Sequence, residues 1–361
     1  MKHGKITLSL LVFSLTIPCL LSGCRSSESK QVKTAISTEL ELLKNLDPDT
    51  IETYVSYADL FPDTQDETDL SSGLVKIFPL FFQDFSYKIL ETDVQEDTAS
   101  AMVRIETIDA QALAKDFSKS LIKKEIFDSA NSDSTEYTLE DYYLLLKNLL
   151  EDNQYKTVEN NCKFILQKKN DAWAVKHSND LDNQLTGGFA SYLADSGLFT
   201  PEEVTAIYFD AIKEFNNEQM SHYLGLENLF DSEDSFYTTI IQELTTQIVK
   251  HFDYQIIGHE KNGQTANVTT EIISYDFKKI LGTYEENLDA YLSSSNALAD
   301  GAEGRLEKSK ELLLSSIREN TSAASATISI LLVNDGSGWS LQMNDEITET
   351  ILGGIAEAVS L

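Results

Sequence analysis

The chain has 361 residues, of which 42% are hydrophobic, and a net charge of −31 from 59 acidic and 28 basic side chains. So large a negative charge repels phosphates and anionic head groups, which argues against nucleic-acid binding and against a body lying flat on a membrane. A solvated acidic surface is the simplest interpretation of this charge, and cation capture is the alternative.

The first 23 residues have the pattern of an export signal. Lys2 and Lys5 give the segment a positive start, and a mostly apolar run follows over residues 6–20. That run is too short to span a bilayer comfortably, and small residues precede Cys24 as a signal peptidase requires. The closing tetrad, Leu21–Cys24, resembles the lipobox of bacterial lipoproteins.

The lipobox resemblance implies that the Cys24 sulfur takes a diacylglyceryl group before cleavage. The membrane is then a partner through this anchor, and the body lies on the extracytoplasmic face of the cell membrane. An ordinary secretory signal with a chance cysteine is the alternative. The polar residues 24–31 are predicted to be a short tether, and the chain after cleavage carries a net charge of −33.

Cysteine usage excludes a disulfide scaffold. Cys19 leaves with the signal and Cys24 is lipidated, so Cys162 has no partner within the mature chain. Hydrophobic cores must therefore stabilise the fold.

The mature chain is predicted to be a tandem duplication. Seven identities align at an offset of 167 residues: Phe85, Tyr87, Ile89, Thr98, Ala99, Ile105 and Asp109 match Phe252, Tyr254, Ile256, Thr265, Ala266, Ile272 and Asp276. Four more align at an offset of 169: Lys44, Tyr54, Leu60 and Phe61 match Lys213, Tyr223, Leu229 and Phe230. Trp173 and the Gly187-Gly188 pair also recur, as Trp339 and Gly353-Gly354. Such self-similarity at a fixed period indicates two copies of one structural unit.

Each copy is predicted to begin with helices. Val32, Ile36, Leu40 and Leu43 have helical spacing in the first copy, and the counterpart helix carries Val204, Tyr208, Ala211 and Phe215. Thr200 to Glu203 forms a capping box with proline in the first turn. Asp47-Pro48 and Asn216-Asn217 open a second helix, and a third helical stretch precedes the strands.

The rest of each copy alternates strands and helices. Two strands are predicted near 85–92 and 99–108, with counterparts near 252–258 and 265–274, and two amphipathic helices follow in each copy. A hairpin then places Cys162, Phe164 and Leu166 inward, matching Ile328, Ile330 and Leu332. Each copy closes with a helix, in which the paired glycines indicate close packing against the sheet or a break.

This order of elements predicts an α+β fold with two repeats, residues 32–195 and 199–361. It resembles the cone-shaped domains of the nuclear-transport-factor-two-like and cystatin-like kind, in which helices pack into a curved antiparallel sheet. The chain as a whole is similar to uncharacterised Gram-positive bacterial surface lipoproteins that carry such modules.

Features shared by both copies are best explained by the fold. Asp109 and Asp276 each end a strand and begin a helix, so they are predicted to be helix caps. The alternative casts Asp109 as a catalytic base with Tyr54 or Tyr87 as donor, as in cone-shaped isomerases. The two tryptophans are predicted to be core aromatics, with pocket walls as the alternative.

No metal or cofactor site is predicted. His177, His222, His251 and His259 lack zinc-ligand spacing, and no phosphate loop or nucleophile elbow occurs. Three acidic clusters lack the glycine and glutamate of a calcium loop: Asp63, Asp66, Glu67 and Asp69; Asp231, Glu233 and Asp234; and residues 128–133. They are interpreted as solvated turns, with weak cation binding as the alternative. Cys162 is predicted to be a buried thiol.

One segment differs strongly between the copies. Residues 77–82 are apolar, whereas the second copy carries Thr245, Thr246 and Gln247 among the six residues there. The segment is a larger local core or a seam between domains, or else Phe78, Leu80, Phe81 and Phe82 form an exposed interaction patch.

Taken together, these patterns predict a non-catalytic, membrane-anchored lipoprotein whose two modules bind a partner protein, a wall component or a small ligand. A solute-capturing lipoprotein with a pocket in one or both domains is the second hypothesis. An isomerase- or hydrolase-type enzyme is the third.

Overall fold

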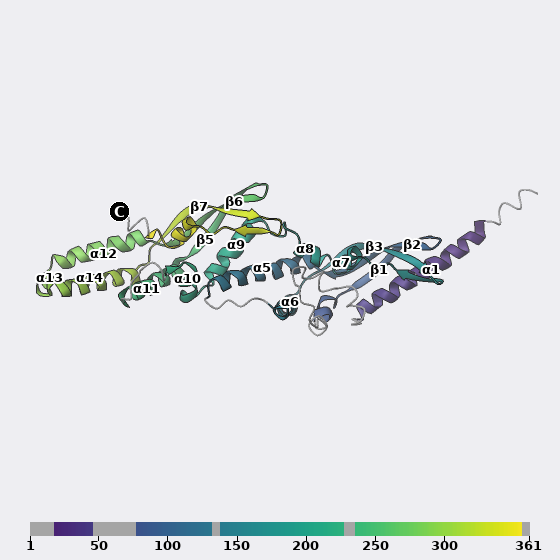
Figure 1. Cartoon of the computed structure of the whole chain (residues 1–361), viewed down its shortest axis with the longest axis horizontal. Helices are drawn as coiled ribbons and strands as arrows, with labels where there is room; N and C mark the ends of the chain where they lie inside the picture. Colours follow the sequence, from purple (N-terminus) through teal and green to yellow (C-terminus); the bar gives the residue numbers. More distant parts are fainter. Residues whose placement is uncertain (1–17, 46–76, 132–137, 227–234, 356–361) are drawn as a thin grey trace, which may run out of the picture. The chain divides into compact units, whose positions relative to one another are not determined.

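The computed structural model describes residues 18–45, 77–131, 138–226 and 235–355. The chain divides into two compact units (Figure 1). Unit 1 contains the described residues up to Phe117 and from 138 to Ala194, and unit 2 contains those from Ser118 to 131 and from Asp195 onward. None of the helices in these ranges combines the length and the apolar character that a membrane span requires.

Unit 1 contains a four-stranded antiparallel sheet whose spatial order follows the chain. Its strands are β1 (Ser86–Gln95), β2 (Thr98–Ile108), β3 (Thr157–Lys169) and β4 (Ala172–Val175). Its helices are α1 (Pro18–Lys44), the start of α5 (Ala110–Ser129), α6 (Leu139–Asp152), α7 (Asn179–Leu185) and α8 (Phe189–Leu193). Residues 77–81 are also helical.

Unit 2 repeats this plan. Its sheet contains β5 (Asp253–Asn262), β6 (Thr265–Tyr275), β7 (Ala323–Asn334) and β8 (Trp339–Leu341), in that order. Its helices are α9 (Pro201–Lys213), α10 (Asn217–Tyr223), α11 (Ser235–His251), α12 (Phe277–Leu292), α13 (Ser295–Ala299), α14 (Gly301–Arg318) and α15 (Asp345–Ile351). The predicted α+β class with two repeats is therefore confirmed.

The two sheets share their register as well as their order. Val103 pairs with Cys162 in unit 1, and Thr270 pairs with Ile328 at the matching place in unit 2. The register also shifts at the same point, between Ile89 and Glu91 in β1 and between Ile256 and Gly258 in β5. A bulge is costly to place by chance and is usually retained within a family, so its repetition supports the duplication.

Local chemistry accounts for where the helices begin. Thr200 forms the predicted capping box, in which its hydroxyl accepts from the backbone and the Glu203 carboxylate reaches back. Thr138 and Asp141 form a second capping box at the start of α6. Asn216 caps α10 in the same way. The prediction at Asp47-Pro48 lies outside the described residues.

Two tyrosines fix the correspondence between α1 and α9. The Tyr87 hydroxyl donates to the Ser37 carbonyl, and the Tyr254 hydroxyl donates to the Ala206 carbonyl, an offset of 169. By this offset Val32, Ile36, Leu40 and Leu43 correspond to Pro201, Thr205, Phe209 and Ile212, all buried. Of the residues predicted for this helix, Val204, Ala211 and Phe215 are buried as well, on a second face.

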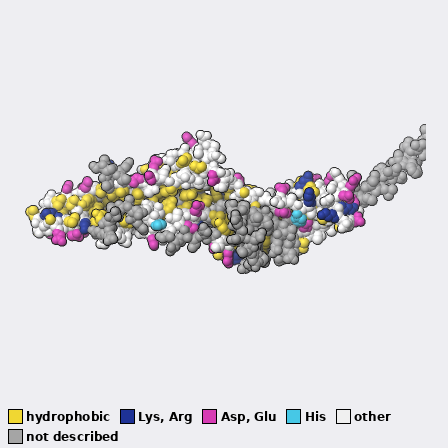
Figure 2. Space-filling model, viewed as in Figure 1, with side chains coloured by type: hydrophobic (Ala, Val, Ile, Leu, Met, Phe, Trp, Pro, Cys, Tyr) yellow, Lys and Arg dark blue, Asp and Glu magenta, His cyan; other side chains and the backbone are white. Residues whose placement is uncertain are grey.

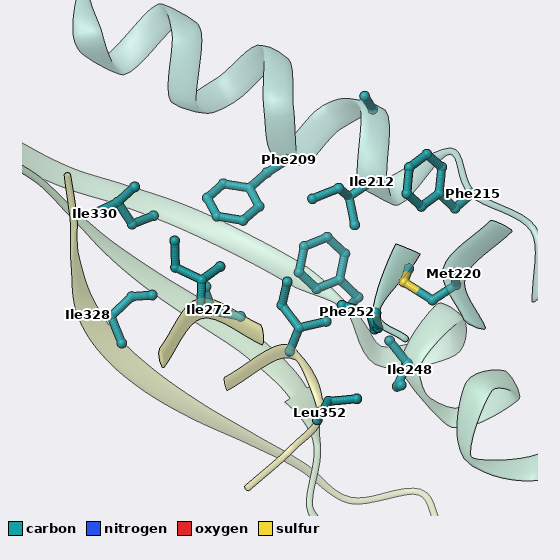
Figure 3. Close-up of a cluster of buried hydrophobic side chains, with 14 of the residues drawn as sticks. Phe209, Ile212, Phe215, Met220, Ile248, Phe252, Ile272, Ile328, Ile330 and Leu352 are labelled. Atoms are coloured by element: carbon teal, nitrogen blue, oxygen red, sulfur yellow. The ribbon is translucent and has the colours of Figure 1, made fainter. Parts of the chain in front are cut away.

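The core of unit 2 lies between α9 and its sheet. Phe209 and Ile212 of α9 face Ile272 of β6 and Ile328 and Ile330 of β7 (Figure 3). These side chains occupy the space between the helix and the sheet. Burial at this scale supplies roughly 1.5–3 kcal/mol per large apolar side chain.

The structure differs from the prediction at the end of α5. The sequence assigned all of 32–195 to the first repeat, yet residues 118–131 belong to unit 2. Ile126 is buried in the core of that unit, and the Phe127 ring lies 5.3 Å from the Phe215 ring, centroid to centroid. The Lys123 ammonium also lies 2.6 Å from the Glu214 carboxylate. Apolar side chains on the last turns of α5 therefore complete a core that the rest of unit 2 leaves open.

The predicted tether also differs. Positions 24–31 continue the backbone of α1 rather than forming an irregular linker. Two side chains in this stretch contact the sheet of unit 1: Glu28 pairs with Lys168 at 2.9 Å, and Ser29 hydrogen-bonds Thr92 at 2.6 Å. These contacts explain why the helix extends beyond its apolar stripe.

Candidate functional site

A cavity of about 480 Å³ opens at one end of the unit 1 sheet. Its walls come from the helical segment 77–81, the approach to β1, the end of β2, the end of α6 and the start of β3. The lining residues are Leu80, Phe81, Gln83, Asp84, Ile108, Leu150, Glu151, Asn153, Gln154, Tyr155 and Thr157. Seven of these eleven side chains are polar and four are apolar, and the volume lies in the range usual for a small-molecule site.

The cavity has an acidic rim. Asp84 and Glu151 line it, and none of its lining residues is Lys, Arg or His. Glu151 is paired with Lys147 at 2.9 Å, whereas the Asp84 carboxylate accepts from the Gln83 amide at 3.3 Å. The lining therefore suits a neutral or cationic molecule with an apolar part and disfavours an anion.

Tyr155 is held in its protonated form. Its hydroxyl donates to Asp116 at 2.8 Å and accepts from the Asn153 amide at 3.3 Å. Burial raises the pKa of Tyr155 strongly, and the hydrogen bond to Asp116 raises it further. A phenol in this state positions a ligand by hydrogen bonding and does not serve as a base near neutral pH.

The matching place in unit 2 is filled. Leu80 corresponds to Gln247, and Gln154 corresponds to Asn320. The Asn320 amide donates to the Gln247 side-chain oxygen at 3.2 Å, and Lys250 donates to the Asn320 carbonyl at 3.1 Å. Both amide side chains are buried. The cavity thus belongs to a part of unit 1 whose sequence has diverged from its copy.

The predicted interaction patch needs correction. Phe78, Phe81 and Phe82 are buried, and Leu80 is only partly exposed. The Phe81 ring lies 5.2 Å from that of Phe82 and 5.9 Å from that of Phe189, centroid to centroid. These rings form a larger local core, which was one of the interpretations that the sequence left open. Aromatic side chains stabilise one another in such tilted packing. Leu80 and Phe81 nevertheless form part of the cavity wall.

The shared aspartates are helix caps, as predicted. The Asp109 carboxylate accepts from the backbone N–H of Ala112 at 3.0 Å, and Asp276 accepts from that of Lys279 at 2.9 Å. Tyr87 does not meet Asp109, because its hydroxyl donates to Glu41 at 3.0 Å. Tyr54 lies outside the described residues. The acid–base pair of the enzyme hypothesis is therefore not assembled from Asp109 and Tyr87.

The remaining candidates take structural positions. Trp173 and Trp339 are 8% and 7% exposed, which confirms them as core aromatics. Cys162 is fully buried, and burial raises the pKa of its thiol to about 12, so it is an inert thiol as predicted.

The acidic clusters are only partly described. Asp128 pairs with Lys124 one helical turn away, whereas the other two clusters lie outside the described residues. Within the ranges that the structure describes, no three His, Cys, Asp or Glu side chains converge closely enough to hold a metal ion. Figure 2 shows acidic side chains spread over the visible face without gathering in one patch.

A polar cluster in unit 1 escaped the sequence analysis. His177, just after β4, lies 2.8 Å from Glu39 of α1 and 3.6 Å from Asp182 of α7. Glu39 corresponds to Tyr208 in unit 2, and His177 corresponds to Met343. The replacement of both residues in unit 2 could have revealed the pair from the sequence. Recognising it requires that α1 be aligned with α9 at the 169-residue offset. The cluster joins α1 to α7 in unit 1 only.

Glu39 gives this cluster a pH dependence. Burial raises the pKa of Glu39, and the neighbouring His177 opposes this in part. A carboxyl group with a raised pKa stabilises the folded state at low pH, and the contribution is lost as pH rises through the raised pKa. Glu39→Gln cannot ionise, so it is expected to exceed wild-type stability at about pH 8, by a margin that shrinks toward pH 5.

Urea midpoints across this pH range, followed by Trp173 fluorescence, would measure the difference. The matched control is His177→Gln, which removes the group that favours the charged carboxylate and is expected to lower stability. A margin for Glu39→Gln that stays constant with pH would contradict the assignment.

A second, more open groove of about 740 Å³ lies between α10 and α11 of unit 2. Its lining is mostly hydroxyl and amide groups, and several are already paired, as in the 2.9 Å bond from Asn217 to Thr246. Its polar side chains are thus partly engaged by their own neighbours, which makes it a weaker candidate than the cavity of unit 1.

Comparison with known proteins identified no family. No family description and no curated protein matches the chain. Among solved structures, the chain is similar to YcdA, a lipoprotein from Bacillus subtilis subsp. subtilis str. 168. The similarity amounts to 14% sequence identity over 74% of this chain and 96% of that one, with a TM-score of 0.26.

Proposed function

We propose that this chain is a lipid-anchored lipoprotein on the extracytoplasmic face of the cell membrane, whose two α+β units bind and do not catalyse. The observation that carries the anchor is the sequence Leu21–Cys24 after a charged start and a short apolar run. Two acyl chains on Cys24 give stable attachment where one chain would be marginal, at about 0.8 kcal/mol per buried methylene.

Replacing the lipidated cysteine is the direct test. In Cys24→Ser, metabolic labelling with a fatty acid is expected to disappear from the protein, and the chain is expected to move from the membrane to the soluble fraction. The sulfur is the only site to which the diacylglyceryl group attaches, so the loss should be complete. Cys162→Ser is the matched control and should keep both the label and the membrane position. Labelling that survives in Cys24→Ser would contradict the anchor.

A binding role is supported by the state of the polar groups near the cavity. Tyr155 is protonated and bound to Asp116, and Glu151 is paired with a lysine. The Thr157 hydroxyl of the lining is likewise engaged, because it donates to the Glu106 carboxylate at 2.6 Å. These groups can orient a ligand without transforming it. The partner of the two units would be a protein, a wall component or a small molecule.

A specific observation favours solute capture as a second candidate function. The cavity of unit 1 combines four apolar side chains with seven polar ones, whereas the matching Gln247 and Asn320 of unit 2 are buried and hydrogen-bonded to each other. Its ligand would be a neutral or cationic molecule with an apolar part. We place this site in unit 1 only.

The repeat itself supplies a test of this capture. The double variant Leu80→Gln/Gln154→Asn gives unit 1 the pair that fills unit 2, so it is expected to abolish small-molecule binding. Protein purified under mild conditions would be denatured, and the released molecules identified by mass spectrometry. Leu144→Gln alters a leucine of unit 1 that is 53% exposed and absent from the lining, so it should bind normally. Equal release from wild type and the double variant would count against capture at this cavity.

A further inference from the structure

The beginning of α1 is a feature of unit 1 that its copy lacks. By the 169-residue offset, the start of α9 at Pro201 corresponds to Val32. Thr200 caps α9 at that point, whereas α1 continues toward the N-terminus through residue 24. The extra helix is therefore not required by the repeat, and it directly adjoins the cysteine proposed to carry the lipid.

This extra helix contacts the sheet as far toward the N-terminus as Glu28, one helical turn from Cys24. Glu28 pairs with Lys168 at 2.9 Å, and Ser29 hydrogen-bonds Thr92 at 2.6 Å. Beyond them, Val32, Ile36, Leu40 and Leu43 are each 0% exposed, so the docking continues along the helix. Cys24 and Glu28 are one helical turn apart, about 6 Å along the axis. No flexible spacer separates the proposed anchor from the body.

The contacts also define which end of the sheet is nearest Cys24. Thr92 is close to the β1–β2 turn, and Lys168 is next to the β3–β4 turn. The Lys168 backbone N–H donates to the Asp97 carbonyl at 2.8 Å, so the two turns lie together. The N-terminal part of α1 lies at this same end of the sheet (Figure 1).

The cavity lies at the opposite end of the sheet. Ile108 ends β2, and Thr157 begins β3, and both line the cavity. From Lys169 to Glu159 the strand covers ten residues, or about 33 Å at 3.3 Å per residue. The two ends of unit 1 therefore differ greatly in their distance from the cysteine.

We infer that α1 is a rigid stalk that holds the β1–β2 and β3–β4 turns of unit 1 against the phospholipid head groups and directs the cavity mouth away from them. This inference rests on the proposed lipidation of Cys24 and adds an orientation to it. The surface that meets the lipid includes Glu96, Asp97, Asn170 and Asp171, all exposed. Because the chain is acidic, the docked helix sets this orientation rather than attraction to anionic lipid.

Position-dependent quenching would test the orientation. The lipidated full-length protein, with Cys162→Ser added, would be reconstituted into phosphatidylcholine vesicles carrying nitroxide head groups. A fluorophore would be attached at Asp97→Cys in one sample and at Glu159→Cys in another. Fluorescence at 97 is expected to fall relative to nitroxide-free vesicles, and fluorescence at 159 is expected to remain unchanged.

A linker variant provides the control for the stalk. A glycine-serine insertion after Arg25 separates the lipid from the docked helix while leaving the fold intact, and it is expected to abolish quenching at 97. Equal quenching at 97 and 159, or quenching at 97 that survives the linker, would overturn the orientation alone. A protein that fails to float with the vesicles would overturn the lipid anchor itself, and the orientation with it.

Discussion

Replacing Gly353 with alanine is expected to destabilise unit 2 by about 2–5 kcal/mol. The residue has φ +70°, a left-handed conformation that costs an alanine about 1–2 kcal/mol. A Cβ atom at Gly353 would also lie 2.4 Å from the Tyr275 carbonyl oxygen and 3.3 Å from its ring. Because backbone atoms must move to relieve that contact, overpacking adds about 1–3 kcal/mol.

The neighbouring glycine is a matched control. Gly354 has φ +76°, but a Cβ there meets nothing within 4 Å. Gly354→Ala should therefore show only the backbone cost of about 1–2 kcal/mol. The chain has two tryptophans, one in each unit, so Trp173→Phe leaves Trp339 as the reporter of unit 2 during urea unfolding. Equal losses for the two alanine variants would show that the close approach to Tyr275 does not matter.

Phe209→Ala is expected to cost about 3–5 kcal/mol, the usual range for deleting a buried aromatic ring. The Phe209 side chain is 0% exposed on α9. Its ring lies 5.1 Å from that of Tyr254 and 6.1 Å from that of Phe252, centroid to centroid. Alanine at this position would lose both ring contacts and leave a cavity between α9 and the sheet.

The sequence of unit 1 suggests a substitution at Phe209 that should destabilise the protein less than alanine does. Phe209 corresponds to Leu40, which fills the same position in unit 1, so Phe209→Leu should cost only about 1–2 kcal/mol. The Trp339 signal in the Trp173→Phe background would again report the unfolding of unit 2. A cost for Phe209→Ala no greater than that for Phe209→Leu would mean that unit 2 repacks freely around α9.

Much of the fold could be predicted because the same order of elements occurs in both copies of the repeat. The strands and the caps at Asp109 and Asp276 depend on short-range patterns that recur at a fixed offset, and the capping box at Thr200 depends on the residues next to it. The paired glycines were predicted to pack against the sheet or to break the helix, and they do both. Local patterns are reliable when neighbouring residues alone decide the conformation.

What could not be predicted depends on contacts between distant parts of the chain. Polarity indicated a tether over residues 24–31, but Glu28 finds Lys168, which is 140 residues away. At Phe78 and Phe82, apolar character left a larger local core, a seam between domains and an exposed patch all open, because a one-dimensional pattern does not show what covers a ring. The Glu39–His177 pair was hidden for the same reason, since its members meet only when α1 docks.

The end of α5 has a consequence for how many copies this chain can hold. Ile126 and Phe127, which complete unit 2, correspond to Ser293 and Ser294 at the end of α12. Serine cannot cover an open core as isoleucine and phenylalanine do, and arrays of repeats commonly end in a copy with a polar outer face. A third copy packed in the same way would lack these two covering side chains.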